Sequence, residues 1–290
     1  MSLIFTNHTD PREFHDAVID HLLLREVECC ALIGLIRRMQ RDGYKPVSTD
    51  ELDRPLLCTI HSGPRLELVA VQTLKTTMMI TRAPDDVIEH LAKELTSRHW
   101  SGTILIGVVP SIQRLADHYS LLSDRPRSLV CRLRVFQLER ITWPRPTTGA
   151  IRLCRPEDRE TLASFMTGFN RAVGEPLEEN ILTRADRAIA DQRIFFWTDP
   201  HPVAMAGWAG PTPNGVRINS VYTPHEFRNR GYASNLVAHL TQRLLDLGYR
   251  YCFLFTDLAN PTSNRIYQQM GYRPVSDSER WKFGAALVQT

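Results

Sequence analysis

A basic, glycine-containing turn is the part of this sequence best suited to binding an anion. Residues 221–234 read Val-Tyr-Thr-Pro-His-Glu-Phe-Arg-Asn-Arg-Gly-Tyr-Ala-Ser, so a strand-like run ends in a turn and a helical pattern follows. Backbone N–H groups at a helix N-terminus have no partner within the helix, and the helix dipole adds partial positive charge. Arg228 and Arg230 add full charges, and Gly231 lets a phosphate approach the backbone. The alternative is an ordinary strand–turn–helix with two solvated arginines.

A second polar stretch, residues 256–272, directly follows the next predicted strand. It places the amide side chains of Asn260 and Asn264 at the mouth between the two strands. Tyr267, one turn into the following helix, can aim its phenol hydroxyl at the same mouth. Taken singly, Asn260 is equally well explained as a helix cap and Tyr267 as a core aromatic residue.

Together, the two stretches resemble the GNAT superfamily of acyl-CoA-dependent N-acyltransferases, whose pyrophosphate motif reads Q/R-x-x-G-x-G/A. Here the motif is Arg-Asn-Arg-Gly-Tyr-Ala at residues 228–233. The resemblance continues through the asparagine loop to the Tyr-Gln-Gln-Met-Gly-Tyr sequence at residues 267–272. In the order of its elements it covers most of residues 150–283.

The resemblance implies a binding site for acetyl-CoA. In this family the strand before the motif separates from its neighbour, and the pantetheine arm of CoA bonds its backbone, here Val221 and Thr223. The amides of residues 228–234 would hold the pyrophosphate, and Asn260 would bond the pantetheine arm. Tyr267 matches the acid that protonates the departing thiolate, a task suited to a phenol pKa near ~10. The implied cofactor-binding residues are Val221, Tyr222, Thr223, Arg228, Asn229, Arg230, Gly231, Tyr232, Ala233, Ser234, Asn260 and Asn264.

The implied reaction is direct attack of a neutral amine on the thioester carbonyl, whose oxygen the backbone N–H near Val221 would polarise. Some family members carry a glutamate on the strand before the motif, but residues 217–220 here read Arg-Ile-Asn-Ser. The base that removes the amine proton therefore stays open among Glu175, His225, Glu226 and a chain of water molecules.

The elements that would position this site fall into two halves. A chain of 290 residues suffices for roughly two domains of ~150 residues. A stretch with two prolines and a glycine marks the best linker, so we expect domains at 1–142 and 150–290 joined by residues 143–149. In the second half we expect strands at 150–154, 194–198, 203–209, 216–223 and 251–256, and helices at 162–169, 178–190, 236–247 and 264–270.

The first half has a similar rhythm of elements. We expect one long helix over residues 10–43, with a bend at Gly34, and then an antiparallel meander within residues 57–81. The nearest analogue of the anion-binding turn, residues 108–112, contains Pro110, which lacks an amide donor. This half resembles the degenerate N-terminal domain of tandem GNAT proteins, and we expect it to bind no CoA. The implied fold class is α+β with a mixed sheet: two GNAT-like domains, each a mostly antiparallel twisted sheet flanked by helices.

Composition excludes several other classes of protein. The 35 Lys and Arg residues against 32 Asp and Glu give a net charge of +3, too small for a general nucleic-acid surface. The longest apolar runs are well short of the ~20 residues that span a bilayer, and the first residues do not resemble a signal peptide. We therefore expect a cytoplasmic protein with no membrane or nucleic-acid partner. The 6 cysteines show no zinc spacing, which favours free thiols and no metal.

The sequence thus predicts a transferase that moves an acetyl group from acetyl-CoA to a primary amine, acting as a monomer or homodimer. The acceptor, a small molecule or a peptide, is not indicated. Two alternatives are a non-catalytic CoA-binding or interaction module and an enzyme that uses a larger acyl group. The volume of the pocket near Tyr222 and Phe169 would separate the two acyl sizes.

Overall fold

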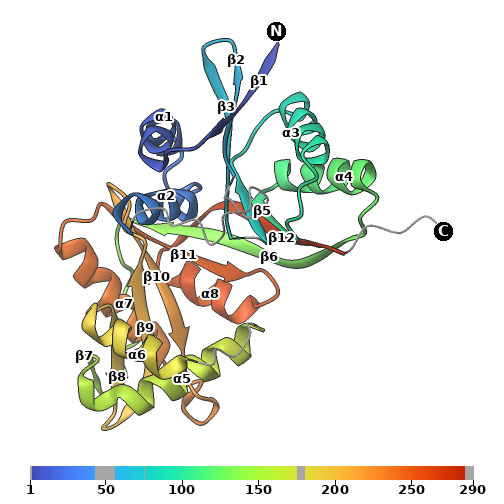
Figure 1. Ribbon diagram of the computed structural model, residues 1–290. Helices are drawn as coiled ribbons and strands as arrows, with labels where there is room; N and C mark the ends of the chain where they lie inside the picture. Colours follow the sequence, from blue (N-terminus) through green and yellow to red (C-terminus); the bar gives the residue numbers. More distant parts are fainter. Residues whose placement is uncertain (1, 43–55, 75, 175–179, 285–290) are drawn as a thin grey trace. The chain divides into compact units, whose positions relative to one another are not determined.

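The structure is a computed structural model that describes residues 2–42, 56–74, 76–174 and 180–284 (Figure 1). Contacts within the chain define two compact units. Unit 1 comprises Met1–Val135, Asp257–Ala259 and Val275–Thr290, and unit 2 comprises Phe136–Thr256 and Asn260–Pro274. Residues 143–149, the predicted linker, lie within unit 2. The domain limits 1–142 and 150–290 stay a prediction.

Unit 2 contains the anion-binding turn, and its sheet is mostly antiparallel. The strand order is β11-β10-β9-β8-β7, and only the pair β10–β11 is parallel. The strands are β7 (Ala150–Leu153), β8 (Ile194–Thr198), β9 (Pro202–Ala209), β10 (Gly215–Tyr222) and β11 (Tyr251–Asp257).

Helices cover both faces of this sheet. Helix α7 (Tyr232–Asp246) joins β10 to β11, and its leucines at four-residue spacing pack on Val216 and Ile218. On the other face, α5 (Arg159–Val173) and α6 (Ile181–Ala190) pack on β8 and β9 through a separate apolar cluster. Helix α8 (Pro261–Gln269) follows β11. The two faces of β10 therefore alternate between the α7 side and the α5 side.

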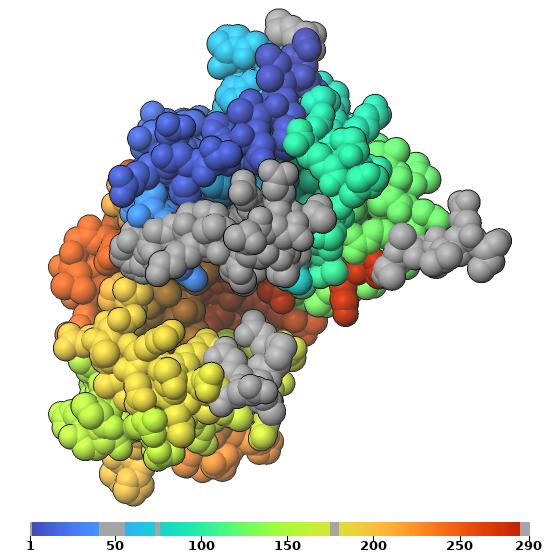
Figure 2. Space-filling model, viewed as in Figure 1, coloured from blue at the N-terminus to red at the C-terminus, as the bar shows by residue number. Residues whose placement is uncertain are grey.

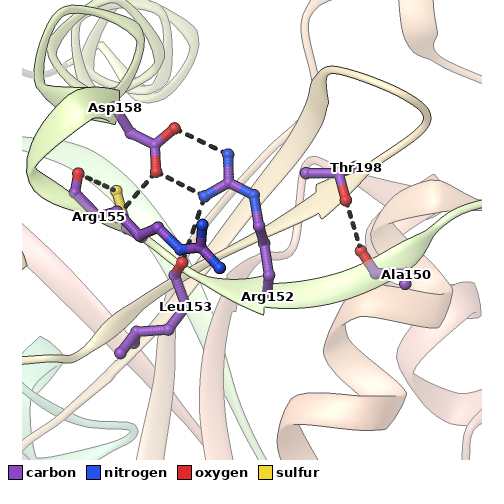
Figure 3. Close-up of polar contacts among 7 residues, drawn as sticks. Ala150, Arg152, Leu153, Arg155, Asp158 and Thr198 are labelled. Atoms are coloured by element: carbon purple, nitrogen blue, oxygen red, sulfur yellow. Dashed lines mark hydrogen bonds and ion pairs between the residues drawn. The ribbon is translucent and has the colours of Figure 1, made fainter.

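The start of α5 is fixed to the edge strand by one arginine. Figure 3 shows the guanidinium of Arg152 on β7 donating to both carboxylate oxygens of Asp158, at 2.6 and 2.8 Å. Asp158 ends the short 3-10 helix η2 (Pro156–Asp158), and the backbone N–H of Arg155 donates to the same carboxylate at 2.8 Å. These hydrogen bonds, those from Arg152 first, lower the pKa of Asp158 below its ordinary value. The ion pair thereby sets where α5 begins.

Unit 1 has a sheet of order β1-β2-β3-β4-β5-β12-β6, with helices packed on it. The strands β6 (Arg127–Leu138) and β12 (Arg273–Phe283) have residues in both units. The remaining elements are β1 (Leu3–His8), α1 (Pro11–Leu23), α2 (Cys30–Asp42), β2 (Leu57–Ser62), β3 (Arg65–Leu74), β4 (Thr77–Ile80), α3 (Asp85–Ser97), β5 (Ile104–Val108) and α4 (Ser111–Ser123).

The single long helix predicted for residues 10–43 is wrong. The structure has two helices, and the break lies between Leu23 and Cys30 rather than at Gly34, which lies inside α2. Asp10 caps α1 as predicted, because its carboxylate accepts the N–H of Arg12 at 2.7 Å. Strand β1 was not predicted. The antiparallel meander of β2, β3 and β4 is confirmed.

The two units share one arrangement: an antiparallel meander leads into a parallel pair of strands that is joined by a helix. In unit 1 this pair is β4–β5, joined by α3, so the counterpart of the anion-binding turn lies at residues 81–84. The analogue chosen from sequence, residues 108–112, is therefore wrong, because it follows the second strand of the pair. The first turn of α3 carries Asp85 and Asp86, whose negative charges disfavour a phosphate there. The predicted fold class, mostly antiparallel mixed sheets flanked by helices, is confirmed.

Candidate functional site

The parallel strands β10 and β11 separate part of the way along their length. They pair only from Gly215↔Tyr251 to Arg217↔Phe253, although β10 continues to Tyr222. On its other edge β10 remains paired with β9, through a bulge between Asn219 and Tyr222. Within that bulge Ser220 adopts the left-handed conformation, with φ of 52°. The second half of β10 therefore has no partner in β11, and a gap opens between the two strands.

The turn after β10 leads into an uncapped helix N-terminus. Gly231, the N-cap of α7, has φ of 79°, and no side chain caps the first turn of the helix. Within the described part of the chain, no acceptor is found for the backbone N–H groups of residues 231–234. A Cβ added to Gly231 would meet only Asn235 Nδ2, at 3.6 Å, and Thr147 Cβ, at 3.9 Å. The turn thus presents free donors beside a residue without a side chain.

The two arginines of the motif have different environments. Arg228 Nε donates to the carbonyl oxygen of Thr223 at 3.0 Å, and the Arg228 N–H donates to His225 O at 3.3 Å. Both bonds close the short helix η3 (His225–Phe227) into a compact loop. Arg230 is exposed. Arg228 therefore braces the loop, while the Arg230 guanidinium is available to an anion.

Residues 143–148 run along α7 as a strap. Every second residue of the strap makes a contact with α7 or with the turn before it. Each contact lies about one helical turn closer to the N-terminus of α7 than the one before. The Trp143 ring lies 4.9 Å from that of His239, Asn235 Nδ2 donates to Arg145 O at 2.9 Å, and Thr147 Oγ1 donates to Arg230 O at 3.0 Å. The strap therefore ends on the anion-binding turn.

An aspartate joins the end of the strap to the first residue of α7. Asp199, between β8 and β9, accepts hydrogen bonds from the hydroxyls of Thr148 and Tyr232, the latter at 2.7 Å. These hydrogen bonds, that from Thr148 first, lower the pKa of the Asp199 carboxyl below its ordinary value. Trp197 Nε1 donates to Thr148 O at 2.8 Å, so the strap is held at this end from two sides. Sequence reasoning missed both Asp199 and the strap.

The two asparagines lie at the start of α8. Asn260 is its N-cap, and its side-chain oxygen accepts the Ser263 N–H at 3.0 Å. Asn264 Nδ2 donates to the carbonyl oxygen of Asn260 at 2.8 Å. The amide oxygen of Asn260 therefore caps α8, as the alternative interpretation from the sequence predicted. Its exposed amide nitrogen is the group that a ligand can reach.

Tyr267 lies in the core of unit 2. It is 9% exposed, and its ring centroid lies 6.5 Å from that of Phe136 and 5.8 Å from that of Tyr272. Among the described residues, none bonds its hydroxyl. Burial raises the pKa of Tyr267 above the ordinary phenol value, to about 12. The phenol therefore stays protonated at every pH near neutrality.

Of the three candidate bases, His225 and Glu226 lie on η3 and are exposed. Glu175 lies outside the described residues. Sequence reasoning noted Arg217 and Asn219 only because they replace a carboxylate. The structure leaves Arg217 Nε and Asn219 Oδ1 buried, with no hydrogen-bond partner in the described chain. Their two-residue spacing on one strand was the signal that could have identified them.

Three further observations concern what the chain could hold. The part of the chain that the structure describes contains no group of three or more His, Cys, Asp or Glu arranged for a metal ion. The six cysteines are free thiols, and Cys131 is only partly buried. No described helix combines the length and apolar character needed to cross a membrane.

One family model matches part of the second half of the chain. Residues 159–272 match the model of the acetyltransferase (GNAT) family. No curated protein matches the sequence significantly.

Several solved structures resemble the whole chain. A GCN5-related N-acetyltransferase from Sphaerobacter thermophilus has a TM-score of 0.61 at 15% identity, over 99% of this chain and 98% of that one. A GNAT-family acetyltransferase from Colwellia psychrerythraea gives 0.56 at 12% identity, over 97% and 100%. A tandem GNAT protein from the clavulanic acid biosynthesis pathway gives 0.55 at 11% identity, over 100% of both chains. At these identities the likeness concerns the fold, and it extends over both units.

Proposed function

We propose that the protein transfers an acetyl group from acetyl-CoA to a primary amine, because residues 159–272 match the model of the acetyltransferase (GNAT) family. The match to this family supports an acyltransferase that uses acyl-CoA. The observation that carries the finer proposal is the gap between β10 and β11, which leads directly into the uncapped N-terminus of α7. Unpaired strand backbone and unpaired helix N–H groups thus follow one another along a single segment.

The residues of this segment fit the two chemically different parts of acetyl-CoA. The N–H groups of residues 231–234 and the Arg230 guanidinium would hold the pyrophosphate, and Gly231 keeps that surface free of a side chain. The unpaired edge of β10 at Val221 and Thr223 would bond the amides of the pantetheine arm as an added strand does. The Asn260 amide nitrogen would supply a further donor.

When bound, acetyl-CoA supplies a thioester carbonyl that an amine can attack. The amine nitrogen forms a bond to the carbonyl carbon, and the carbon–sulfur bond then breaks. The Val221 N–H, beyond the last residue that pairs with β11, would polarise the carbonyl oxygen. One proton leaves the amine, and the departing thiolate receives one from the Tyr267 hydroxyl, which its raised pKa keeps protonated. The products are an N-acetylated amine and free CoA.

The base that accepts the amine proton must differ from that of family members with a carboxylate on the strand before the motif. Residues 217–220 of this chain include no carboxylate. His225 and Glu226 are the titratable side chains of the loop that follows β10. Replacing each by alanine tests its role. If the replaced residue is the base, its alanine variant should have a kcat lowered by about 100-fold or more and an unchanged affinity for acetyl-CoA.

Packing at the end of β10 supports a short acyl group. The Tyr222 ring packs edge-on against Phe165 on α5, with the ring centroids 5.9 Å apart. A Cβ added to Gly168 would lie 2.3 Å from the Tyr222 hydroxyl, so the two elements are in close contact. The α5 side of β10 is therefore filled by protein at this point.

The decisive experiment is a calorimetric titration of the full chain with acetyl-CoA, with ATP as the control for nonspecific phosphate binding. We expect saturable binding of acetyl-CoA at micromolar concentrations and none of ATP. A panel of primary amines, followed by thiol release, then detects turnover, and a long-chain acyl-CoA tested in parallel measures acyl preference. No binding of acetyl-CoA up to millimolar concentrations overturns the proposal.

A further inference from the structure

Two buried polar groups on β10 take no part in the reaction described above. Arg217 Nε and Asn219 Oδ1 are shielded from solvent, and neither has a hydrogen-bond partner among the described residues. Over the same residues Arg217 also has no ion-pair partner. Shielded polar atoms in proteins are almost always paired, although Arg217 and Asn219 as whole residues are only partly buried. Their unpaired state points to a partner that is not part of this chain.

Both side chains lie on the face of β10 opposite α7. Val216 and Ile218, which alternate with them, pack under α7. The Arg217 guanidinium lies over the ring of Phe255 on β11, 5.9 Å from its centroid. A ring face stabilises a guanidinium but supplies no hydrogen-bond acceptor.

Their place along the strand connects them to the gap. Arg217 occupies the last position at which β10 pairs with β11, and Asn219 lies two residues further, where the strands have separated. Asn219 pairs with Gly207 on β9, and a Cβ there would lie 3.1 Å from its amide oxygen. The missing side chain of Gly207 therefore leaves room for the Asn219 amide oxygen on the β9 side of the strand.

The chemistry of the two groups is complementary to one kind of molecule. A guanidinium binds a carboxylate through two parallel hydrogen bonds, and an amide oxygen accepts an N–H. The Cα atoms of Arg217 and Asn219 are about 7 Å apart along the strand, and both side chains extend from the same face of it, so one small molecule can contact both. Residues 217–220 include no carboxylate that would attract a polyamine.

We infer that the acceptor is an amine that also carries a carboxylate, as a free amino acid does. Arg217 binds its carboxylate, and Asn219 accepts a hydrogen bond from its amino group. The inference rests on the proposed acetyltransferase function and names the substrate class of the same site. A third unpaired oxygen, Asn170 Oδ1, lies on α5, the helix that packs on this side of the sheet; Asn170 is 1% exposed.

The test compares matched acceptors in the full-length protein. The panel contains common α-amino acids and ω-amino acids, each beside the primary amide or the alkylamine that lacks its carboxylate. For the best pair we expect kcat/KM to favour the carboxylate by about 100-fold. Arg217→Gln should reduce this preference to a few-fold while the Kd of acetyl-CoA, measured by calorimetry, stays unchanged. Arg217→Lys, which keeps the charge, should retain part of the preference.

The matched control is Arg193→Gln. The Arg193 guanidinium also stacks on an aromatic ring, that of Trp208 at 5.2 Å, but Trp208 packs in the cluster on the α7 face. This variant should keep both the carboxylate preference and the affinity for acetyl-CoA.

Other results overturn the inference. They are equal use of acceptors with and without the carboxylate, turnover confined to uncharged amines, or an Arg217→Gln enzyme that weakens acetyl-CoA binding and keeps the acceptor preference. If Arg217→Gln does not fold, two other measurements test the inference. They are the activity of Asn219→Ala and the wild-type ratio of kcat/KM for acceptors with and without the carboxylate. Failure of acetyl-CoA itself to bind refutes the proposed function and is recognised separately by the calorimetric titration.

Discussion

The hydroxyl of Tyr232 donates a hydrogen bond of 2.7 Å to Asp199 Oδ2. Tyr232 is the first residue of α7, and Asp199 lies between two strands of the same unit. The same carboxylate also binds Thr148, at the end of the strap. The position of the anion-binding turn is therefore fixed by a side chain outside the sequence motif.

Asp199→Ala should weaken acetyl-CoA binding by about 5-fold, as expected for the loss of one hydrogen-bonded brace. Because the folded-state pKa of Asp199 is lowered, the brace is present above its ordinary value of 3.8 and is lost as pH falls through the folded-state pKa. Calorimetry at pH 7 measures the binding effect. Asp191→Ala, which removes an exposed carboxylate away from the turn, is the control and should bind normally. Equal affinities in the two variants would show that the brace does not act on the turn.

Gly231→Val should abolish measurable acetyl-CoA binding. Valine resists the φ of 79°, and its side chain would stand where the pyrophosphate approaches. Gly248→Val is the matched control, because Gly248 follows the C-terminus of the same helix with φ of 99° and no atom within 4 Å of an added Cβ. Both variants should lose about 1 to 2 kcal/mol of stability. Normal binding by Gly231→Val contradicts the anion-site assignment.

Tyr267→Phe should lower kcat by about 100-fold and leave the Kd of acetyl-CoA unchanged. Since burial raises the pKa of Tyr267 to about 12, loss of its proton should not limit kcat below about pH 11. The control is Tyr272→Phe, which removes a buried hydroxyl that bonds Thr241 at 2.7 Å. It should cost about 1 kcal/mol of stability and preserve kcat. A fully active Tyr267→Phe enzyme removes this residue from the mechanism.

Asp158→Asn should destabilise unit 2 by about 1 kcal/mol at pH 7, because the Arg152 guanidinium then loses its charged acceptor. The lowered pKa of Asp158 means that the stabilisation exists above pH 3.8 and disappears as pH falls through the folded-state pKa. Urea unfolding at pH 7 and at pH 2.5 measures this change. Asp186→Asn, which breaks the exposed pair with Arg159, should leave the midpoint unchanged at both pH values.

Local patterns identified most elements of the fold. The leucines at four-residue spacing predicted α7, and the alternation of turn residues with apolar runs predicted the strands of unit 2 within one or two residues. The failure at residues 10–43 has a clear reason: Ile19, Leu23 and Val27 keep a four-residue apolar spacing through the segment between the two helices, so periodicity alone shows no break. Strand β1 pairs only with β2, a long-range contact that its short polar sequence does not reveal.

The anion-binding turn was also accessible to sequence reasoning, because its donors come from consecutive backbone groups. What supports that turn was not. The Asp199–Tyr232 contact joins residues 33 positions apart, and the Asn235–Arg145 contact joins residues 90 apart. Neither follows from spacing. The residues that the strap contacts are set by how an extended segment lies along a helix, which is a property of the folded chain.

The separation of β10 from β11 leaves backbone hydrogen bonds unmade, whereas the corresponding pair of strands in unit 1, β4 and β5, makes them. In unit 1, β5 pairs with every residue of β4, from Thr77↔Ile104 to Ile80↔Gly107, so that backbone is satisfied by the protein itself. In unit 2 the second half of β10 forgoes these bonds. The amide hydrogens of Val221 and Thr223 should therefore exchange with solvent far faster than those of Ile104–Val108. A ligand that fills the gap raises the melting temperature by mass action, and protection from exchange appears first along this single strand edge.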